Sequence, residues 1–347
     1  MRRRDLIILL AGTAPRAWAA QGLQFPADAG AHPASRTEWW YVTGSLEAGA
    51  RLWGFQVTFF RSATGVTGSN ASRFAATELV FAHAALSDLA QQRLLHDQRV
   101  ARSGFDIANA DVGDTAVALR DWRLMRAGAG YRAVVASDSA GFVLDLALEP
   151  TQPLLLQGDA GLSRKGPSPE HTSRYYSEPQ LAVAGTLTQA GRPTAVTGRA
   201  WLDHEWSDAF LPPEAVGWDW IGMNLDDGSA LTAFRLRRAG GTPVYAGGSL
   251  RRRGEAVRNF APGEVEFTPL RTWQSAASQA RYPVRWRVRT PAGTHEVAAL
   301  LDDQELDSRG STGAIYWEGL SDLLDDRGRR IGRGYLEMTG YAARLRL

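Results

Sequence analysis

The sequence has 347 residues, 44% of them hydrophobic, with no cysteine and with 39 basic against 37 acidic residues. A globular composition of this length suggests about two domains. Residues 1–19 hold four arginines and one aspartate, so their removal would leave 35 cations and 36 anions. This near-neutral balance gives no support for nucleic acid as a partner. The lack of cysteine excludes disulfides and a lipid anchor on an N-terminal cysteine.

The N-terminus has the pattern of an export signal. Three arginines at 2–4 precede a short apolar run, and residues 17–19 match an A-x-A cleavage site. Residues 3–7 also fit a twin-arginine pattern. The apolar run is too short to span a bilayer. We therefore expect a signal peptide at 1–19 and an exported protein, periplasmic or secreted.

From Glu38 onward the sequence consists of short runs in which polar and apolar residues alternate. Such runs occur at 53–60, 142–148 and 285–289, and glycine and proline separate them. Strand-length runs with turn residues between them are typical of a β-sandwich or a β-barrel. Helical periodicity is restricted to 322–326 and to the residues just after Leu86. We therefore expect an all-β fold.

An internal repeat indicates two similar β-domains. The pattern from Trp39 to Val57 recurs from Trp218 to Leu236, so that each matched position is 179 residues from its counterpart. Each copy predicts an aromatic-rich strand, a turn at a glycine and a second strand. A spacing of about half the chain is typical of a duplicated domain. We expect domains at 20–209 and 210–347, joined by the proline-rich segment 211–214.

Residues 198–208 carry the strongest candidates for catalysis. Asp203, His204 and Glu205 follow one another between Trp201 and Trp206. In a strand, alternation would place Trp201, Asp203 and Glu205 on one face. His204 and Trp206 would share the other face. An acid buried beside an indole has a raised pKa and can stay protonated near neutral pH. The alternative is that these carboxylates pair with arginines and only tie two segments together.

Aromatic residues surround the repeat starts and the acidic stretch. Trp39 and Trp40 are consecutive, so alternation cannot bury both on one face, and one of them should line a cavity or a domain interface. Glu38 directly precedes this pair. The further candidates for a binding cavity are Tyr175, Tyr176, Trp206, Trp218 and Trp220. The alternative for the tryptophans is core packing, and for the tyrosines a hydrogen-bonded strand start at the surface.

Signatures of nucleophilic and metal catalysis are missing from the sequence. There is no G-x-S-x-G elbow. His204-Glu205 could open a zincin motif, but Asp208 stands where that motif requires a second histidine. No two of the six histidines are spaced i, i+2 or i, i+4, so we predict no metal. His83, on an apolar run, is expected to be a hydrogen-bonded core residue.

The sequence resembles the AttH-like, carotenoid 1,2-hydratase (hydroxyneurosporene synthase) family, in its exported, secreted hydrolase-like branch. The resemblance is carried by E-W-W-Y-V-T-G at 38–44, G-F-Q-V-T-F-F-R at 54–61, R-Y-Y-S at 174–177, G-R-A-W-L-D-H-E-W at 198–206, W-D-W at 218–220 and G-Y-L-E-M-T-G-Y at 334–341. It implies two lipocalin-like (calycin) β-barrels packed side by side, with no metal or organic cofactor.

The activity that the resemblance implies is hydration of a terminal isoprenoid double bond. An acid protonates the alkene, a tertiary carbocation forms, and water adds to it. Asp203 occupies the position of the family's acid. Trp201 and Tyr176 occupy aromatic positions that would stabilise the cation. His204 or Glu205 would orient the acid or activate the water.

Three functions remain open at this level. The first is an exported protein that binds a hydrophobic small molecule, isoprenoid or lipid-like, and hydrates it by acid catalysis. The second is a non-catalytic carrier in lipid traffic, associated with an exporter or a membrane surface. The third is a hydrolase in which Glu205 and His204 activate water.

Overall fold

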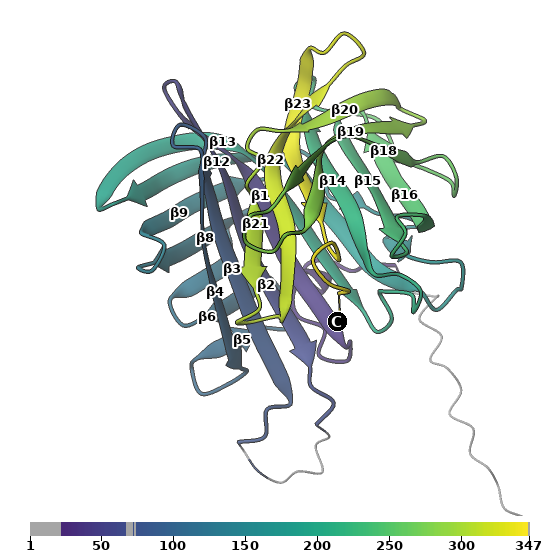
Figure 1. The fold of residues 1–347 in the computed structure, drawn as a ribbon. Coiled ribbons are helices and arrows are strands. Elements are labelled where there is room, and N and C mark those ends of the chain that lie inside the picture. The colour runs from purple at the N-terminus through teal and green to yellow at the C-terminus, as the bar shows by residue number, and fades with distance from the viewer. Residues whose placement is uncertain (1–21, 67–71, 73, 346–347) are drawn as a thin grey trace, which may run out of the picture.

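The computed structural model describes residues 22–66, 72 and 74–345, and in these residues the protein is all-β (Figure 1). One 3-10 helix, η2 (Ala27–Ala29), precedes two antiparallel sheets. The first sheet contains β1 (Thr37–Ala48), β2 (Arg51–Ala63), β3 (Glu78–Asp88), β4 (Arg93–Arg102), β5 (Ala108–Ala110), β6 (Ala116–Leu119), β7 (Trp122–Ala127), β8 (Gly130–Ser137), β9 (Phe142–Glu149), β10 (Leu155–Leu156), β11 (Leu162–Arg164), β12 (Thr172–Gln189) and β13 (Arg192–Ser207). The second contains β14 (Gly217–Leu225), β15 (Ala230–Arg237), β16 (Pro243–Arg251), β17 (Arg258–Asn259), β18 (Glu266–Gln274), β19 (Arg281–Thr290), β20 (Gly293–Ala299), β21 (Glu305–Ser308), β22 (Ala314–Leu324) and β23 (Arg330–Met338).

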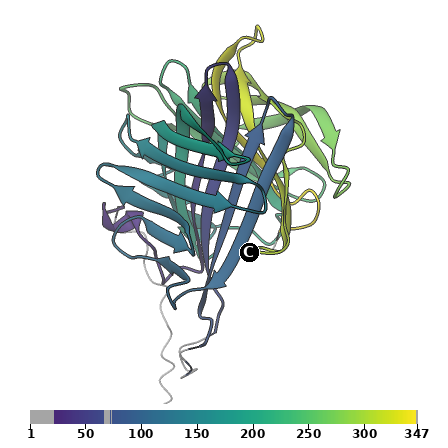
Figure 2. The ribbon, with the colours of Figure 1, turned by 90° about the vertical axis from the view of Figure 1, so that its left-hand side faces the viewer.

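The first sheet curls into a nearly closed barrel. Its strand order is β4-β3-β2-β1-β13-β12-β9-β8-β7-β6-β5, and β5 and β6 come back against β3 and β4. This sheet faces the viewer in Figure 2. Large apolar side chains from alternate strand positions, among them Trp53, Trp122 and Leu144, are fully buried inside it. The runs at 53–60 and 142–148, in which polar and apolar residues alternate, form strands β2 and β9, as predicted.

The second sheet repeats the central arrangement of the first. Its order is β17-β16-β15-β14-β23-β22-β20-β19-β18, so β14 lies between β15 and β23 as β1 lies between β2 and β13. Both repeat copies form the predicted hairpins. Their turns contain Gly49 and Gly228 at φ +61° and +86°, a left-handed conformation that favours glycine. Trp286 and Trp317 are fully buried in the core of this sheet.

The two sheets pack against each other along their central strands. β1 contacts β23, β13 contacts β14, and β2 contacts β22, and Figure 1 shows these strands together in the middle of the molecule. A separate cluster of buried aromatic side chains fills this contact, including Tyr41, Trp201, Trp220, Phe234 and Tyr335. The chain passes from one sheet to the other between Ser207 and Gly217.

The two short helical candidates are wrong. β22 runs through residues 322–324, where Leu323 pairs with Gly332 and is buried in the second core. The residues after Leu86 end β3 at Asp88 and then turn. Burial of alternate residues against a sheet outweighs a brief helical spacing of leucines.

The predicted signal peptide at 1–19 lies outside the described residues. Across the segments that the structure describes, we find no helix with the length and apolarity to cross a membrane.

The contact between the sheets depends on a glycine in β2. A Cβ atom at Gly54 would lie 2.7 Å from the Tyr335 hydroxyl and 2.8 Å from Leu320 Cβ, both in the second sheet. We expect Gly54→Ala to lower the free energy of unfolding by about 1–3 kcal/mol, because overpacking would force the sheets apart. Urea denaturation would measure this. Gly240→Ala is the control, since no described atom lies within 4 Å of its Cβ position; equal stability of both variants would contradict the prediction.

Candidate active site

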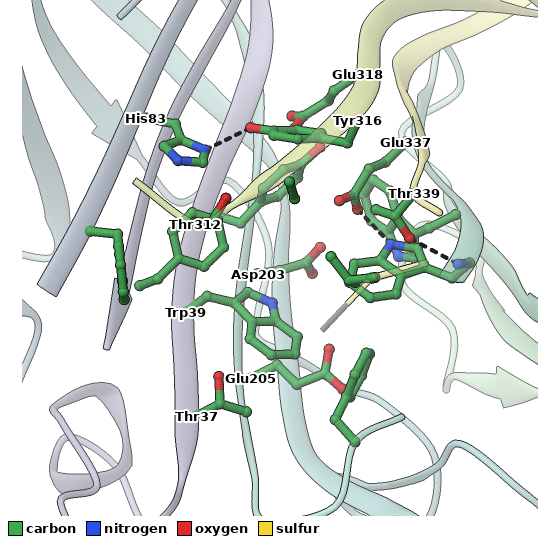
Figure 3. Close-up of a pocket in the computed structure, with 18 of the residues that line it drawn as sticks. Thr37, Trp39, His83, Asp203, Glu205, Thr312, Tyr316, Glu318, Glu337 and Thr339 are labelled. Atoms are coloured by element: carbon green, nitrogen blue, oxygen red, sulfur yellow. Dashed lines mark hydrogen bonds between the residues drawn. The ribbon is translucent and has the colours of Figure 1, made fainter. Parts of the chain in front are cut away.

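A cavity of about 200 Å³ lies where the two sheets meet. Its walls are mainly aromatic and apolar, from Trp39, Phe60, Phe81, Tyr175, Phe210, Trp218, Trp220, Phe234, Leu236 and Tyr316. Four carboxyl groups and one ammonium group also line it, those of Asp203, Glu205, Glu318, Glu337 and Lys165. Figure 3 shows the carboxyls converging from both sheets. Such a cavity suits an apolar ligand that meets a few polar groups.

Alternation along β13 divides the predicted catalytic residues between two faces. Asp203 and Glu205 line the cavity. His204 points the other way, into the first barrel, where its ring stacks on Trp40 with centroids 4.6 Å apart. Trp206 shares that face and lies 4.9 Å from His204. The predicted separation of the two faces is therefore confirmed.

Asp203 is a buried acid at the cavity wall. Its side chain is 3% exposed, and its Oδ1 accepts hydrogen bonds from Trp201 Nε1 at 2.8 Å and Ser177 Oγ at 2.5 Å. Burial, helped by the nearby Glu205, raises the pKa of Asp203 to about 7, although the hydrogen bonds from Ser177 and Trp201 lower it. A substantial fraction of Asp203 is therefore protonated near neutral pH.

Glu205 forms an ion pair with Lys165. The Lys165 Nζ atom lies 2.8 Å from Glu205 Oε1, and Ser173 donates a hydrogen bond to the same oxygen. The ammonium group also lies over the rings of Phe234 and Tyr175, 4.5 and 4.7 Å from their centroids. Burial raises the pKa of Glu205 and Lys165 lowers it. Glu205 is thus paired with a cation, as the alternative in the sequence analysis had it, although the cation is a lysine and not an arginine.

Two further acids come from the second sheet. Glu337 Oε2 accepts a hydrogen bond from Trp218 Nε1 at 3.0 Å, and burial, Asp203 and Glu205 together raise the pKa of Glu337 to about 7. Glu318 Oε2 accepts from Gln56 Nε2 at 2.8 Å, while its Oε1 has no partner in the described part of the chain. Burial and the neighbouring Glu337 raise the pKa of Glu318 well above its usual value, so it is a neutral acid.

Glu38 is the centre of a separate polar cluster inside the first barrel. Its carboxylate is fully buried and accepts from Arg61 Nε at 2.8 Å and from the His32 backbone N–H at 2.9 Å. His204 Nε2 and His32 Nδ1 lie 2.9 and 2.6 Å from its Oε1. Burial opposes ionisation of Glu38, but these two histidines bring its pKa below the usual range. The cluster fastens the lead-in segment to β1, β2 and β13.

His32, Glu38 and His204 are the described residues whose arrangement could hold a metal ion. Their ligand atoms lie within 4.8 Å of one another, although the sequence analysis predicted no metal. The Arg61 guanidinium, which is 1% exposed, already bonds to Glu38 and would repel a cation placed there. The residues therefore fit a salt-bridged structural cluster better than a metal site.

The aromatic candidates, like the residues of β13, divide between the cavity and the interior of the first barrel. Trp39, Tyr175, Trp218 and Trp220 line the cavity, and Trp201 lies behind Asp203. The others face the interior of the first barrel: Trp40, Tyr176 and Trp206. Tyr175 pairs across the strands with Glu205 and lies on its face, whereas Tyr176 pairs with His204. Tyr175 is therefore the tyrosine that lines the cavity.

Sequence reasoning missed Lys165, Glu318 and Glu337. Lys165 is the only lysine in the sequence, and that rarity was a usable signal. Glu337 stands inside the segment 334–341 that carries part of the family resemblance. His83 is buried and hydrogen-bonded, as predicted, but it lies at the cavity wall: its Nδ1 lies 2.8 Å from the Tyr316 hydroxyl of the second sheet, and burial lowers its pKa to about 3.

Comparison with known proteins identifies the family. The AttH-like family model matches residues 16–341, and the chain belongs to this family. The crystal structure of a candidate AttH protein from Nitrosomonas europaea is 48% identical, with a TM-score of 0.86 over 93% of this chain and 98% of that one. The resemblance found in the sequence is thereby confirmed.

Two more distant structures share the fold. Kievitone hydratase from Nectria haematococca is 16% identical, with a TM-score of 0.72 over 94% of both chains. CghA is 15% identical, with a TM-score of 0.53 over 89% of this chain and 88% of that one. No curated protein sequence matches the chain.

Removal of Lys165 tests how much the ion pair at the cavity stabilises the folded protein. Lys165→Met would leave Glu205 buried without a cation, and we expect a loss of about 3–5 kcal/mol in the free energy of unfolding near neutral pH. The loss should shrink as the pH falls. Without Lys165 the pKa of Glu205 in the folded protein lies further above its value in the unfolded chain. The variant therefore keeps its stability below the unfolded-state pKa of Glu205 and loses it as the pH rises through the folded-state pKa.

Chemical denaturation at several pH values between about 4 and 8 would measure this effect. The control is the double variant Lys165→Met with Glu205→Gln, which removes both charges and should recover part of the stability. If the single and double variants lose the same stability at every pH, Glu205 does not depend on Lys165.

Proposed function

We propose that this protein binds an apolar small molecule, isoprenoid or lipid-like, between its two sheets and hydrates one of its double bonds by acid catalysis. The observation that carries the proposal is Asp203, a carboxyl group buried at the wall of an aromatic cavity with its pKa raised to about 7. A buried acid with this pKa can donate a proton near neutral pH. The side chains at the cavity suffice for the chemistry without a cofactor.

The proposed reaction begins with proton transfer from Asp203. Trp201 and Ser177 both donate to its Oδ1, so the transferable proton resides on Oδ2. The electron pair of the double bond forms the new C–H bond, and the adjacent carbon becomes a carbocation. Trp39, Tyr175 and Trp220 line the space where that charge would develop, and an aromatic ring beside a desolvated cation is worth roughly 1 kcal/mol or more. Water then bonds to the cation and releases a proton.

The family and one structural neighbour support this proposal. The chain is AttH-like over residues 16–341, and kievitone hydratase, whose name describes a hydration, shares the fold. Since that likeness extends to the fold alone, the substrate class proposed for this chain is argued from the apolar walls of its own cavity.

Asp203→Asn gives the direct test. We expect the mature wild-type protein to release a bound apolar molecule on solvent extraction, and to convert part of it to a product heavier by one water. The asparagine variant should carry the same molecule unhydrated, because an amide cannot supply the proton. Mass spectrometry of the two extracts, with labelled water during incubation, would measure this. Full turnover by the variant would show that Asp203 is not the acid.

A carrier is the second candidate, and the mainly apolar cavity lining favours it equally. The same unmodified molecule in wild type and Asp203→Asn would support a carrier. The hydrolase alternative requires Glu205 and His204 to act on one water. Because they face opposite sides of β13, the two side chains cannot act together on one water.

We also propose that the protein is exported, from the pattern at residues 1–19. Expression of the full sequence in a Gram-negative host should give a periplasmic protein that begins after residue 19, as N-terminal sequencing would show. Lysines in place of Arg3 and Arg4 should keep export by the general route and abolish it by the twin-arginine route. A protein that stays in the cytoplasm with an intact N-terminus would contradict the proposal.

A further inference from the structure

We infer that Glu337 is the base that takes the proton from the attacking water, so that each of the two duplicated sheets contributes one carboxyl group to the reaction. This inference rests on the proposed hydration and names its second catalytic residue.

The strand register places the two acids at equivalent positions of the repeat. Asp203 in β13 lies opposite Tyr41 in β1, and Glu337 in β23 lies opposite Trp220 in β14. Tyr41 and Trp220 are corresponding positions of the internal repeat, 179 residues apart. Asp203 and Glu337 are therefore counterparts in the two sheets.

The two carboxyls also share their surroundings. Both line the same cavity and both accept a hydrogen bond from one indole N–H, that of Trp201 for Asp203 and that of Trp218 for Glu337. Figure 3 shows them on different strands, both pointing toward the middle of the cavity. Neighbouring buried carboxyls cannot both ionise at low cost, so one of them keeps the proton while the other is ionised. Such a pair supplies an acid and a base at the same pH.

The other candidate bases are engaged or misplaced. Glu205 is held by Lys165 and Ser173 on one oxygen. Glu318 keeps its proton, because burial and Glu337 raise its pKa well above the usual value. His204 lies across β13, in the first barrel. His83 lines the cavity, but both its ring nitrogens already have hydrogen-bond partners, the Tyr316 and Ser311 hydroxyls.

The proton balance of the step closes without another reactant. Asp203 gives a proton to one alkene carbon, the water oxygen bonds to the other carbon, and Glu337 takes one proton from that water. The product is the alcohol, with Asp203 ionised and Glu337 protonated. Transfer of one proton from Glu337 back to Asp203, directly or through water, restores the starting state.

The titration of Glu337 depends on every charged group that faces it. Glu318 lies beside it on β22, Asp203 and Glu205 face it from β13, and Lys165 partly neutralises Glu205. Tyr41 on β1 and Tyr316 on β22 also interact with Glu337, and both stay neutral, because burial raises the pKa of each phenol well above the usual value. In this set, Asp203 and Glu337 are the carboxyls whose pKa is raised to about 7, close to neutral pH.

Infrared titration of the mature protein tests the pairing without a substrate. The parts of the protonated-carboxyl band that belong to Asp203 and Glu337 should disappear in two coupled steps in the wild type, while the part that belongs to Glu318 stays. Glu337→Gln should leave one step and lower the midpoint of Asp203 by about one pH unit, because the neighbouring negative charge is gone. The control is Glu178→Gln, which removes a buried acid bonded to Tyr131 inside the first barrel and away from the cavity. An unchanged Asp203 midpoint in Glu337→Gln would overturn the pairing.

Turnover tests the base. With geranylgeraniol as a probe in ¹⁸O-labelled water, Glu337→Gln should lose about a hundredfold in kcat with little change in KM. Glu337→Asp should recover part of the rate, and Glu178→Gln should match the wild type. If the wild type hydrates the probe and Glu337→Gln is equally active, the role of Glu337 as the base is overturned and the proposed hydration stands. No hydration by wild type, although the probe binds, overturns the proposed hydration and the base role together, while the infrared result still decides whether the two acids share a proton.

Discussion

The cost of burying carboxyl groups governs the centre of this molecule. Four of them meet at one apolar cavity with a single ammonium group. The structure meets that cost in different ways: Glu205 has Lys165, Asp203 and Glu337 have indole donors, and Glu318 remains a neutral acid. Because pairing is incomplete, protons stay on acids that would ionise in water. The chemistry proposed for the cavity is a direct consequence of this shortage of cations.

Period-two alternation decides which groups belong to that cavity. Along β13, each step of one residue moves a side chain from the cavity to the interior of the first barrel. His204 therefore joins Glu38 in a cluster inside the first barrel, although its sequence neighbours Asp203 and Glu205 line the cavity. One strand thus serves two purposes, a buried polar anchor on one face and acid chemistry on the other.

The sequence was sufficient for the fold class and for half of the site. Alternating runs and the repeat from Trp39 and Trp218 predicted β-hairpins that the structure contains, and Asp203 was identified from its position beside Trp201. Alternation gives two faces but does not say which face meets the cavity, so Tyr175 and Tyr176 were both candidates although only Tyr175 lines it. Glu337 and Glu318 could not be found this way, because their relation to Asp203 depends on how two separately paired sheets pack.

The cavity lies between the two sheets that carry the internal repeat. A single β-barrel of this kind often holds its ligand inside, but large side chains such as Trp53 and Trp286 fill both interiors here. An apolar molecule can then be enclosed at the interface between the sheets. The two sheets approach closely there at Gly54. An acid from each sheet can reach such a ligand only when the two sheets are packed together, so the contact between the sheets also assembles the site.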